Sequence, residues 1–220
     1  MPALQEVFPP FGLSLRAGPL ELLPITDDVI PGLIELVDAG VHPPDVMPFA
    51  VPWTDDPPHV RRVGSAQFYW QSRASFKPAA WAQEFAVIHD GVLVGAQAFT
   101  TRDYLVTKSG ETGSWIGQAH QGRGIGTLMR QAICAWCFDH LDAELLTSGA
   151  YLDNPSSLAV SRKVGYRENG LVRQTHRAGQ WGTVQKLVLT PETFVRGPDR
   201  LEVFGNEAFR RFIGLDAPAP

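Results

Sequence analysis

The chain has 220 residues, 44% of them hydrophobic and 10% aromatic, which excludes a mainly disordered protein and leaves room for one well-packed α/β domain. Its net charge of −4 provides no basic field for nucleic acid, and no apolar run is long enough to span a bilayer. It has only two cysteines, and its N-terminus lacks a basic region followed by an apolar stretch, so we expect a cytoplasmic protein without a disulfide framework.

Hydrophobic spacing and turn residues predict alternating strands and helices after an extended arm at 1–12. Thr26 and Asp27 offer N-caps to the first helix, while Asn154 and Gly165 delimit a later one. Strands are expected at 13–23 (one strand or a hairpin), 84–89, 92–99, 111–117, 143–150, 166–176 and 181–189. Helices are expected at 26–38, 58–75, 124–140, 155–164 and 205–213.

No repeat or linker divides the chain, so we expect one domain over 13–190, preceded by the arm and followed by an extension at 191–220. Aromatic side chains in that extension are expected to dock either on a partner subunit, in a homodimer, or on their own domain. A second feature is the segment from His42 to Pro58, which holds six prolines in 17 residues and is therefore predicted to be a stiff loop.

Six glycines fall within residues 110–126, between a predicted strand and a predicted helix. Glycine lets a ligand approach the main chain, and the free N–H groups of a first helical turn attract a diphosphate. A P-loop would require a Gly-Lys-Ser/Thr ending, but Gly126 is followed by Thr127. A dinucleotide fingerprint would require G-x-G-x-x-G, but Gly122, Gly124 and Gly126 are spaced two and two. The pattern Gln/Arg-x-x-Gly-x-Gly/Ala of acyl-coenzyme A cradles fits at every required position.

A second motif follows one helix and one strand later, where Asn154-Pro-Ser-Ser157 opens a helix that ends at Gly165-Tyr166. In this order and at this separation, the two motifs resemble those of the GNAT N-acyltransferase superfamily, and most closely its branch that acetylates N-termini of ribosomal proteins. The resemblance spans about 13–190. It implies an α/β fold with a mixed, mostly antiparallel central sheet of about seven strands, flanked by helices and splayed at the cofactor cleft.

The resemblance also implies roles for residues around the cradle. Backbone groups at the end of the strand before it are expected to pair with pantetheine, and the cradle's own N–H groups to hold the diphosphate. Asn154 and Ser157 match positions that meet the cofactor, although Asn154 also suits a plain N-cap. The implied cofactor-binding residues are Trp115, Ile116, Gly117, Gln121, Gly122, Arg123, Gly124, Ile125, Gly126, Thr127, Asn154 and Ser157. Candidates for the adenosine 3′-phosphate are Arg123, Arg130, Arg162 and Lys163.

The reaction implied is attack of a neutral amine on a thioester, which requires a base for the amine and an acid for the leaving thiolate. Much of the superfamily uses a tyrosine on the last helix as the acid, but Ser161 occupies that position here. Ser157, one turn earlier, is the substitute that the ribosomal-protein branch suggests. Base candidates are Glu84 and Glu111 on strands, with His120 and Asp103 nearby in the chain. Phe49 and Trp53, in the proline-rich loop, are expected to form a wall of the acceptor pocket.

We therefore expect transfer of an acyl group, by default acetyl, from acyl-CoA to a primary amine of a small molecule or a protein N-terminus, by direct attack in a ternary complex. No metal is expected, because Cys134-Ala-Trp-Cys137 lies in a helix without a second pair or a histidine cluster. Two alternatives stay open. One is a non-catalytic CoA-binding or regulatory protein, and the other is a succinyl-CoA-type transferase.

Overall fold

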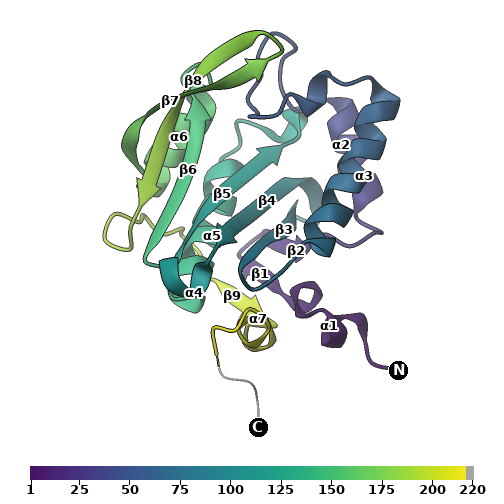
Figure 1. Cartoon of the computed structure of the whole chain (residues 1–220), viewed down its shortest axis with the longest axis vertical. Coiled ribbons are helices and arrows are strands. Elements are labelled where there is room, and N and C mark those ends of the chain that lie inside the picture. The colour runs from purple at the N-terminus through teal and green to yellow at the C-terminus, as the bar shows by residue number, and fades with distance from the viewer. Residues whose placement is uncertain (217–220) are drawn as a thin grey trace.

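One open sheet of nine strands organises the computed structural model, which describes residues 1–216. The strand order is β7-β8-β6-β5-β4-β3-β2-β1-β9, and every neighbouring pair is antiparallel except β5 and β6. The expected mixed, mostly antiparallel sheet flanked by helices is confirmed (Figure 1). It is larger than expected because 13–23 forms a hairpin and a further strand joins the edge.

The strands are β1 (Ser14–Ala17), β2 (Leu20–Pro24), β3 (Ala80–His89), β4 (Val92–Arg102), β5 (Ser109–Ile116), β6 (Leu145–Tyr151), β7 (Arg167–Arg177), β8 (Gln180–Leu189) and β9 (Glu202–Phe204). The helices are α1 (Leu4–Val7), α2 (Ile30–Ala39), α3 (Pro58–Ala74), α4 (Tyr104–Thr107), α5 (Ile125–His140), α6 (Pro155–Val164) and α7 (Asn206–Phe212). Short 3₁₀ helices lie at Pro9–Gly12, Trp53–Asp55 and Gln118–His120. Within residues 1–216, no helix combines the length and apolar character that crossing a membrane requires.

Helices cover both faces of the sheet, as the alternation of side chains along β3 requires. Phe85 packs with Trp136 of α5 on one face, in a core that also takes in Phe99 of β4. Its neighbour Ala86 points the other way, where α2 and α3 pack on the sheet; this second layer is seen on the right of Figure 1. The sheet therefore has an α5 face and an α2–α3 face, and the site described below involves both.

Two expectations for the N-terminal region are wrong. Residues 1–12 are not extended but form α1 and a 3₁₀ turn, in which the Phe8 ring packs edge-on against Phe76 and Phe212. The first long helix begins at Ile30 rather than near 26, and Asp27 does not cap it. The Asp27 carboxylate instead accepts hydrogen bonds from Arg73 and Trp70 of α3, at 2.6 and 3.0 Å, so a distant partner displaces the local one.

The end of the chain packs on its own domain as far as the structure describes it. β9 pairs antiparallel with β1, and Phe209 of α7 and Ile213 are fully buried in the main core. Helix α7 was expected from the sequence, but β9 was not, because three residues carry no strand pattern of their own. Residues 217–220 of the expected extension lie outside the described residues.

Candidate active site

The one parallel pair in the sheet, β5 with β6, is joined only at one end. The pairing covers Ser109–Glu111 against Leu145–Thr147. Beyond it, β5 continues to pair with β4 as far as Ile116, and β6 with β8 as far as Tyr151. The facing edges of the two strands are therefore splayed. The Ser148 hydroxyl donates to Thr112 O at 3.1 Å at the start of the splay, and backbone groups further along the two edges are available to a ligand. Trp115 and Ile116 lie at the splayed end of β5, as the sequence predicted.

A buried arginine bridges this splay from the α5 face. Arg130 of α5 is 4% exposed and donates from its two terminal nitrogens to Ser148 Oγ of β6 at 3.1 Å and to Ser114 Oγ of β5 at 2.9 Å. Its guanidinium also lies 5.9 Å from the centre of the Tyr166 ring. No acidic side chain of residues 1–216 pairs with it, and its Nε has no partner there. The sequence-based idea that Arg130 meets the 3′-phosphate is wrong, because this side chain is enclosed between strands and helix.

The glycine-rich cradle lies between β5 and α5 with its backbone donors uncommitted. Gly122 and Gly124 have φ of +75° and +83°, which strain any other L-residue, and Gly124 is the N-cap residue of α5. Within the described chain, the N–H groups of residues 122–126 have no hydrogen-bond acceptor. Free N–H groups at a helix N-terminus, next to left-handed residues, form a concave anion site. This cradle fits the diphosphate of an acyl-CoA.

Substituting single glycines should separate backbone conformation from ligand approach. Gly124→Ala should lower the free energy of unfolding by about 1–2 kcal/mol, because alanine is strained at positive φ, and weaken CoA binding. Gly126 has no positive φ, and a Cβ there would make ordinary 3.5 Å contacts. Gly126→Ala should therefore stabilise α5 by roughly 1 kcal/mol and preserve CoA affinity. Thermal unfolding and calorimetric CoA titration check the pair, and equal CoA affinity in both variants would contradict the expectation.

Two other residues assigned to the cofactor have internal partners. The Gln121 amide nitrogen donates to the carbonyl oxygens of Ile116 and Val41, both at 2.8 Å, so its side chain ties the end of β5 to the segment after α2. The backbone N–H of Gly117 donates to Val94 O at 2.9 Å. The Gln121 amide nitrogen and the Gly117 N–H are therefore engaged within the protein, and only the other polar groups of these two residues are available to a ligand.

The N-terminus of α6 has the geometry that the sequence predicted. Asn154 caps the helix by accepting from the Ser157 N–H at 3.1 Å, so its plain N-cap role is real. Ser157 is half-buried in the first turn. Ser161, at the position where relatives carry a tyrosine, is buried and donates back to Ser157 O at 3.0 Å. The Ser161 hydroxyl is thus bound within α6, which leaves Ser156 and Ser157 as the hydroxyl groups in the first turn of this helix.

An apolar groove of about 450 Å³ lies on the α2–α3 face, where both the proline-rich loop and β5 border it. It brings together Phe49 and Trp53 from the loop, Glu84 from β3 and Trp115 from β5. The rings of Phe49 and Trp53 are 5.0 Å apart, and those of Trp53 and Trp115 are 6.5 Å apart. The groove residues on β5 belong to its splayed part, so the groove borders the strand that forms one side of the gap between β5 and β6.

Of the three candidate carboxylates, only Glu84 lies in this groove. Desolvation raises its pKa from 4.5 to about 7, against a smaller lowering by the Ser72 hydroxyl of α3. A carboxyl with this pKa is suited to act as a base near neutral pH. Glu111 is exposed, lies outside the groove lining although it is on the same face of β5 as Trp115, and is 4.0 Å from Lys186 Nζ. Asp103 is exposed beside α4, and His120 lies in the turn before the cradle, so neither joins Glu84.

Tyr69 of α3, one of the aromatic residues in the region where the family resemblance implies acceptor binding, is buried in the same groove. Burial and the nearby Glu84 raise the pKa of its hydroxyl above the usual value, and a hydrogen bond with Trp115 opposes this. The i to i+4 spacing of apolar residues in α2 and α3 was the only available indication of these contacts. The two thiols lie outside the groove, in the main core: burial raises the pKa of Cys134 to about 11, and Cys137 is equally enclosed. No cluster of three or more metal-ligating side chains occurs within residues 1–216.

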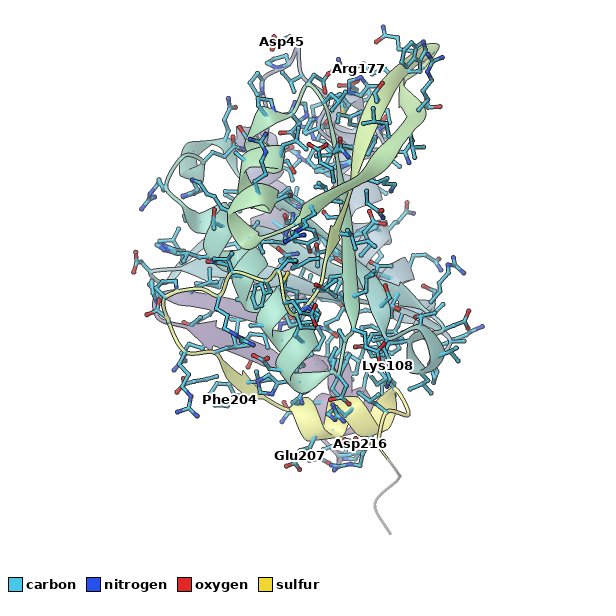
Figure 2. All side chains as sticks on the ribbon, turned by 90° about the vertical axis from the view of Figure 1, so that its left-hand side faces the viewer. Asp45, Lys108, Arg177, Phe204, Glu207 and Asp216 are labelled. Carbon is cyan, nitrogen blue, oxygen red and sulfur yellow. The ribbon has the colours of Figure 1, made fainter. Side chains whose placement is uncertain are left out.

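The β7–β8 hairpin holds the proline-rich loop over the splayed strands. Arg177 of β7 makes a two-nitrogen contact with Asp55, at 2.7 and 3.2 Å, and donates to Pro44 O at 3.1 Å. His176 Nε2 is 2.6 Å from Met47 O, and its ring lies 4.3 Å from that of Tyr151 at the end of β6. Figure 2 shows Arg177 beside Asp45 of this loop, and Figure 1 shows the hairpin tip reaching the loop. Loop and hairpin thus meet across the open end of the gap.

Breaking the Arg177–Asp55 contact should loosen the loop without unfolding the protein. Exposed ion pairs contribute up to about 1 kcal/mol, so Arg177→Gln should leave the melting temperature nearly unchanged. Amide hydrogen exchange in residues 42–58 should rise several-fold, because the loop loses two anchors at once. Arg173→Gln, on the same strand but stacked on Trp181 rather than on the loop, is the control. Unaltered exchange in Arg177→Gln would contradict the anchoring role of Arg177 and leave the loop to its other contacts, such as those with His176 and Arg61.

Comparison with known proteins agrees with this geometry. Residues 20–167 match the family model described as the acetyltransferase (GNAT) domain. A 90-residue stretch is 29% identical to "Putative ribosomal N-acetyltransferase YdaF" of Bacillus subtilis (strain 168); it covers 41% of this chain and only 49% of that relative. Among solved structures, RimJ of Mycobacterium smegmatis, in complex with CoA-disulfide, aligns with a TM-score of 0.70 at 21% identity, over 81% of this chain and 86% of that one. The microcin C7 self-immunity acetyltransferase MccE, in complex with acetyl-CoA and AMP, aligns with a TM-score of 0.64 at 17% identity, over 79% and 93%.

Proposed function

This chain belongs to the GNAT acetyltransferase family, and from that premise we propose that it transfers an acetyl group from acetyl-CoA to a primary amine by direct attack in a ternary complex. The observation that carries the proposal is the position of Glu84. Its carboxyl lies in a groove that shares Gly113, Ser114 and Trp115 with the splayed part of β5. The base for the amine and the gap for the pantetheine arm therefore both adjoin the splayed part of β5.

Each step can be assigned to groups of this chain. The N–H groups of residues 122–126 hold the diphosphate, and the free backbone edges of β5 and β6 pair with the pantetheine amides. Acetyl-CoA supplies the activated thioester. Glu84 accepts a proton from the ammonium group of the acceptor at a carboxylate oxygen, which leaves the nitrogen lone pair free to attack. The nitrogen then forms a bond to the thioester carbonyl carbon, the C–S bond breaks, and the proton that the nitrogen loses reaches the leaving thiolate. Ser157, at the start of α6, orients the sulfur or a water that relays this proton.

The same groove favours acetyl over succinyl as the transferred group. Among the described residues that line it there is no lysine, arginine or histidine to pair with a distal carboxylate. Burying an unpaired carboxylate in an apolar groove costs several kcal/mol. Parallel assays with acetyl-CoA and succinyl-CoA should give faster thiol release with acetyl-CoA.

One observation favours the non-catalytic alternative, namely that buried Ser161 replaces the usual tyrosine acid. Two measurements separate the functions. Thiol release from acetyl-CoA in the presence of a panel of primary amines tests catalysis, and calorimetric titration with CoA tests binding. CoA binding with amine-dependent thiol release supports the transferase. CoA binding without turnover supports the binding module, and absence of CoA binding would overturn both.

A further inference from the structure

The groove that holds Glu84 is unusually apolar for a site that must admit a charged amine. Its walls are aromatic and aliphatic side chains, including Leu33 and Val37 of α2, Phe68 of α3 and the pair Phe49–Trp53. We propose that the acceptor is a small primary amine carried on a flat, apolar body, with the reacting nitrogen as its only charge. This inference rests on the proposed function, since it names the substrate that the same groove would take.

Charge excludes the polyamine class. Among the described residues of the lining, Glu84 is the only one with a carboxyl group, and none carries a basic side chain. One carboxylate can compensate one ammonium group, and here that group must also give up its proton. Each further ammonium of a polyamine would be buried without a partner, at a cost of several kcal/mol. An acceptor with one amine avoids this cost.

Hydrogen-bonding capacity disfavours a peptide. An extended peptide brings an N–H and a C=O with every residue, and each must be satisfied once it is buried. Gln97 and Ser114 contribute only backbone to the lining, because their side chains lie on the α5 face, paired with Phe85 and with Arg130. On the groove side, the Tyr69 hydroxyl hydrogen-bonds with Trp115 and the Glu84 carboxyl with the Ser72 hydroxyl. The groove therefore offers few partners to a peptide backbone but a large area to a ring.

Size and shape fit a one- or two-ring amine. The groove measures about 450 Å³, within the range of about 300–1,000 Å³ that is typical of small-molecule sites. The Trp53 and Trp115 rings, 6.5 Å apart, line the part of the groove formed by the loop and β5. A Cβ built at Gly64 of α3 or Gly113 of β5 would meet nothing within 4 Å, so both glycines leave open space at the groove wall. A flat ring can use this space.

The test compares single-charge aromatic amines with the two disfavoured classes on the intact chain. Phenethylamine and tryptamine are assayed with acetyl-CoA beside spermidine and a short peptide with a free N-terminal serine. We expect kcat/KM for the aromatic amines to exceed that for the other two by about 30-fold or more. Equal or faster turnover of spermidine or of the peptide would overturn the inference while the proposed function stands.

Binding measurements keep the inference testable if turnover is absent. Calorimetric titration of the CoA-loaded protein should detect phenethylamine binding at concentrations at which spermidine does not bind, and the reverse order would overturn the inference. Absence of CoA binding in the same experiment overturns the proposed function, and amine binding to the protein alone then decides the inference.

A groove-filling variant supplies a structural control. Gly64→Leu improves the helix propensity of α3 while its side chain takes the open space, so the variant is expected to fold at least as stably. KM for tryptamine should rise about 10-fold, with little change for ethylamine, which has no ring, and none in CoA affinity. Val60→Leu, at an exposed position of α3 outside the groove, is the matched control. An unchanged KM for tryptamine in Gly64→Leu would contradict the placement of the ring.

Discussion

Replacing Glu84 with glutamine should lower kcat/KM by about 100-fold or more, because the amide keeps the shape of the side chain but cannot accept the amine proton. In the native protein, kcat/KM should rise with pH and level off above about 7, where the carboxyl is ionised. The Glu84→Gln variant should lack this inflection. Steady-state assays across pH 5–9 with one amine acceptor provide the measurement.

Glu111→Gln is the comparison that discriminates between the two carboxylates. Glu111 lies on the neighbouring part of the sheet but outside the groove, next to Lys186, so its loss should change kcat/KM by less than about 3-fold. If Glu111→Gln is the damaging substitution and Glu84→Gln retains the native pH profile, the assignment of the base is wrong.

The same raised pKa has a consequence for stability. A carboxyl whose pKa is higher in the folded state than in the unfolded state disfavours folding once it is ionised. The free energy of unfolding should therefore fall as the pH rises from 4.5 to about 7, and the Glu84→Gln variant should lack this fall. The expected difference is on the order of 1–3 kcal/mol at pH 8. Urea unfolding of both proteins at pH 5 and pH 8 measures it, and equal slopes against pH would contradict the raised pKa.

The second large effect should come from Arg130, whose loss should weaken CoA binding about 10-fold or more. Its guanidinium links β5 to β6 beyond their last paired residues, through Ser114 and Ser148. Without it, the bonds of Thr112 to Thr147 and Ser148 remain, but the gap proposed to receive pantetheine loses its bridge at Ser114. Arg130→Met should change the melting temperature little, because a buried cation without an acidic partner pays a desolvation cost that the apolar side chain avoids. Calorimetric titration with CoA, together with thermal unfolding, checks both statements.

Arg130→Lys separates bridging from charge. Lysine keeps the positive charge but lacks the planar fork that reaches two hydroxyl groups on different strands. If the arginine acts by bridging, Arg130→Lys should bind CoA as weakly as Arg130→Met. Native affinity in Arg130→Lys would show instead that the charge alone matters.

The parts of the site that were predictable depend on neighbours in the sequence. Gly122 and Gly124 have positive φ, a backbone conformation that is unfavourable for most other residues. Asn154 caps a helix that begins at the next residue. Such features are fixed by local sterics and local hydrogen bonds, so spacing alone reveals them. For the same reason, the bounds of α6 agree with the prediction at both ends.

Features that depend on distant partners were missed or misplaced. Asp27 is as suitable an N-cap residue as Asn154, but its carboxylate accepts hydrogen bonds from Arg73 and Trp70 of α3 instead. β9 has only three residues and exists because β1 offers it an open edge. From the sequence alone, Arg130 resembles an exposed charge on a helix. In the fold it lies beneath the two splayed strands and hydrogen-bonds to a serine of each.

The sequence by itself determined the strand–cradle–helix unit, the second motif at Asn154 and thereby the family, since these depend on backbone conformations that few residue types allow. Only the tertiary structure placed Glu84 inside the groove and Glu111 outside it, and brought Phe49, Trp53 and Trp115 to the groove that holds Glu84. Both glutamates are single charges on strands, and their proton affinity depends on desolvation by elements far away in the chain. That desolvation exists only after α2, α3 and the proline-rich loop have packed on the sheet.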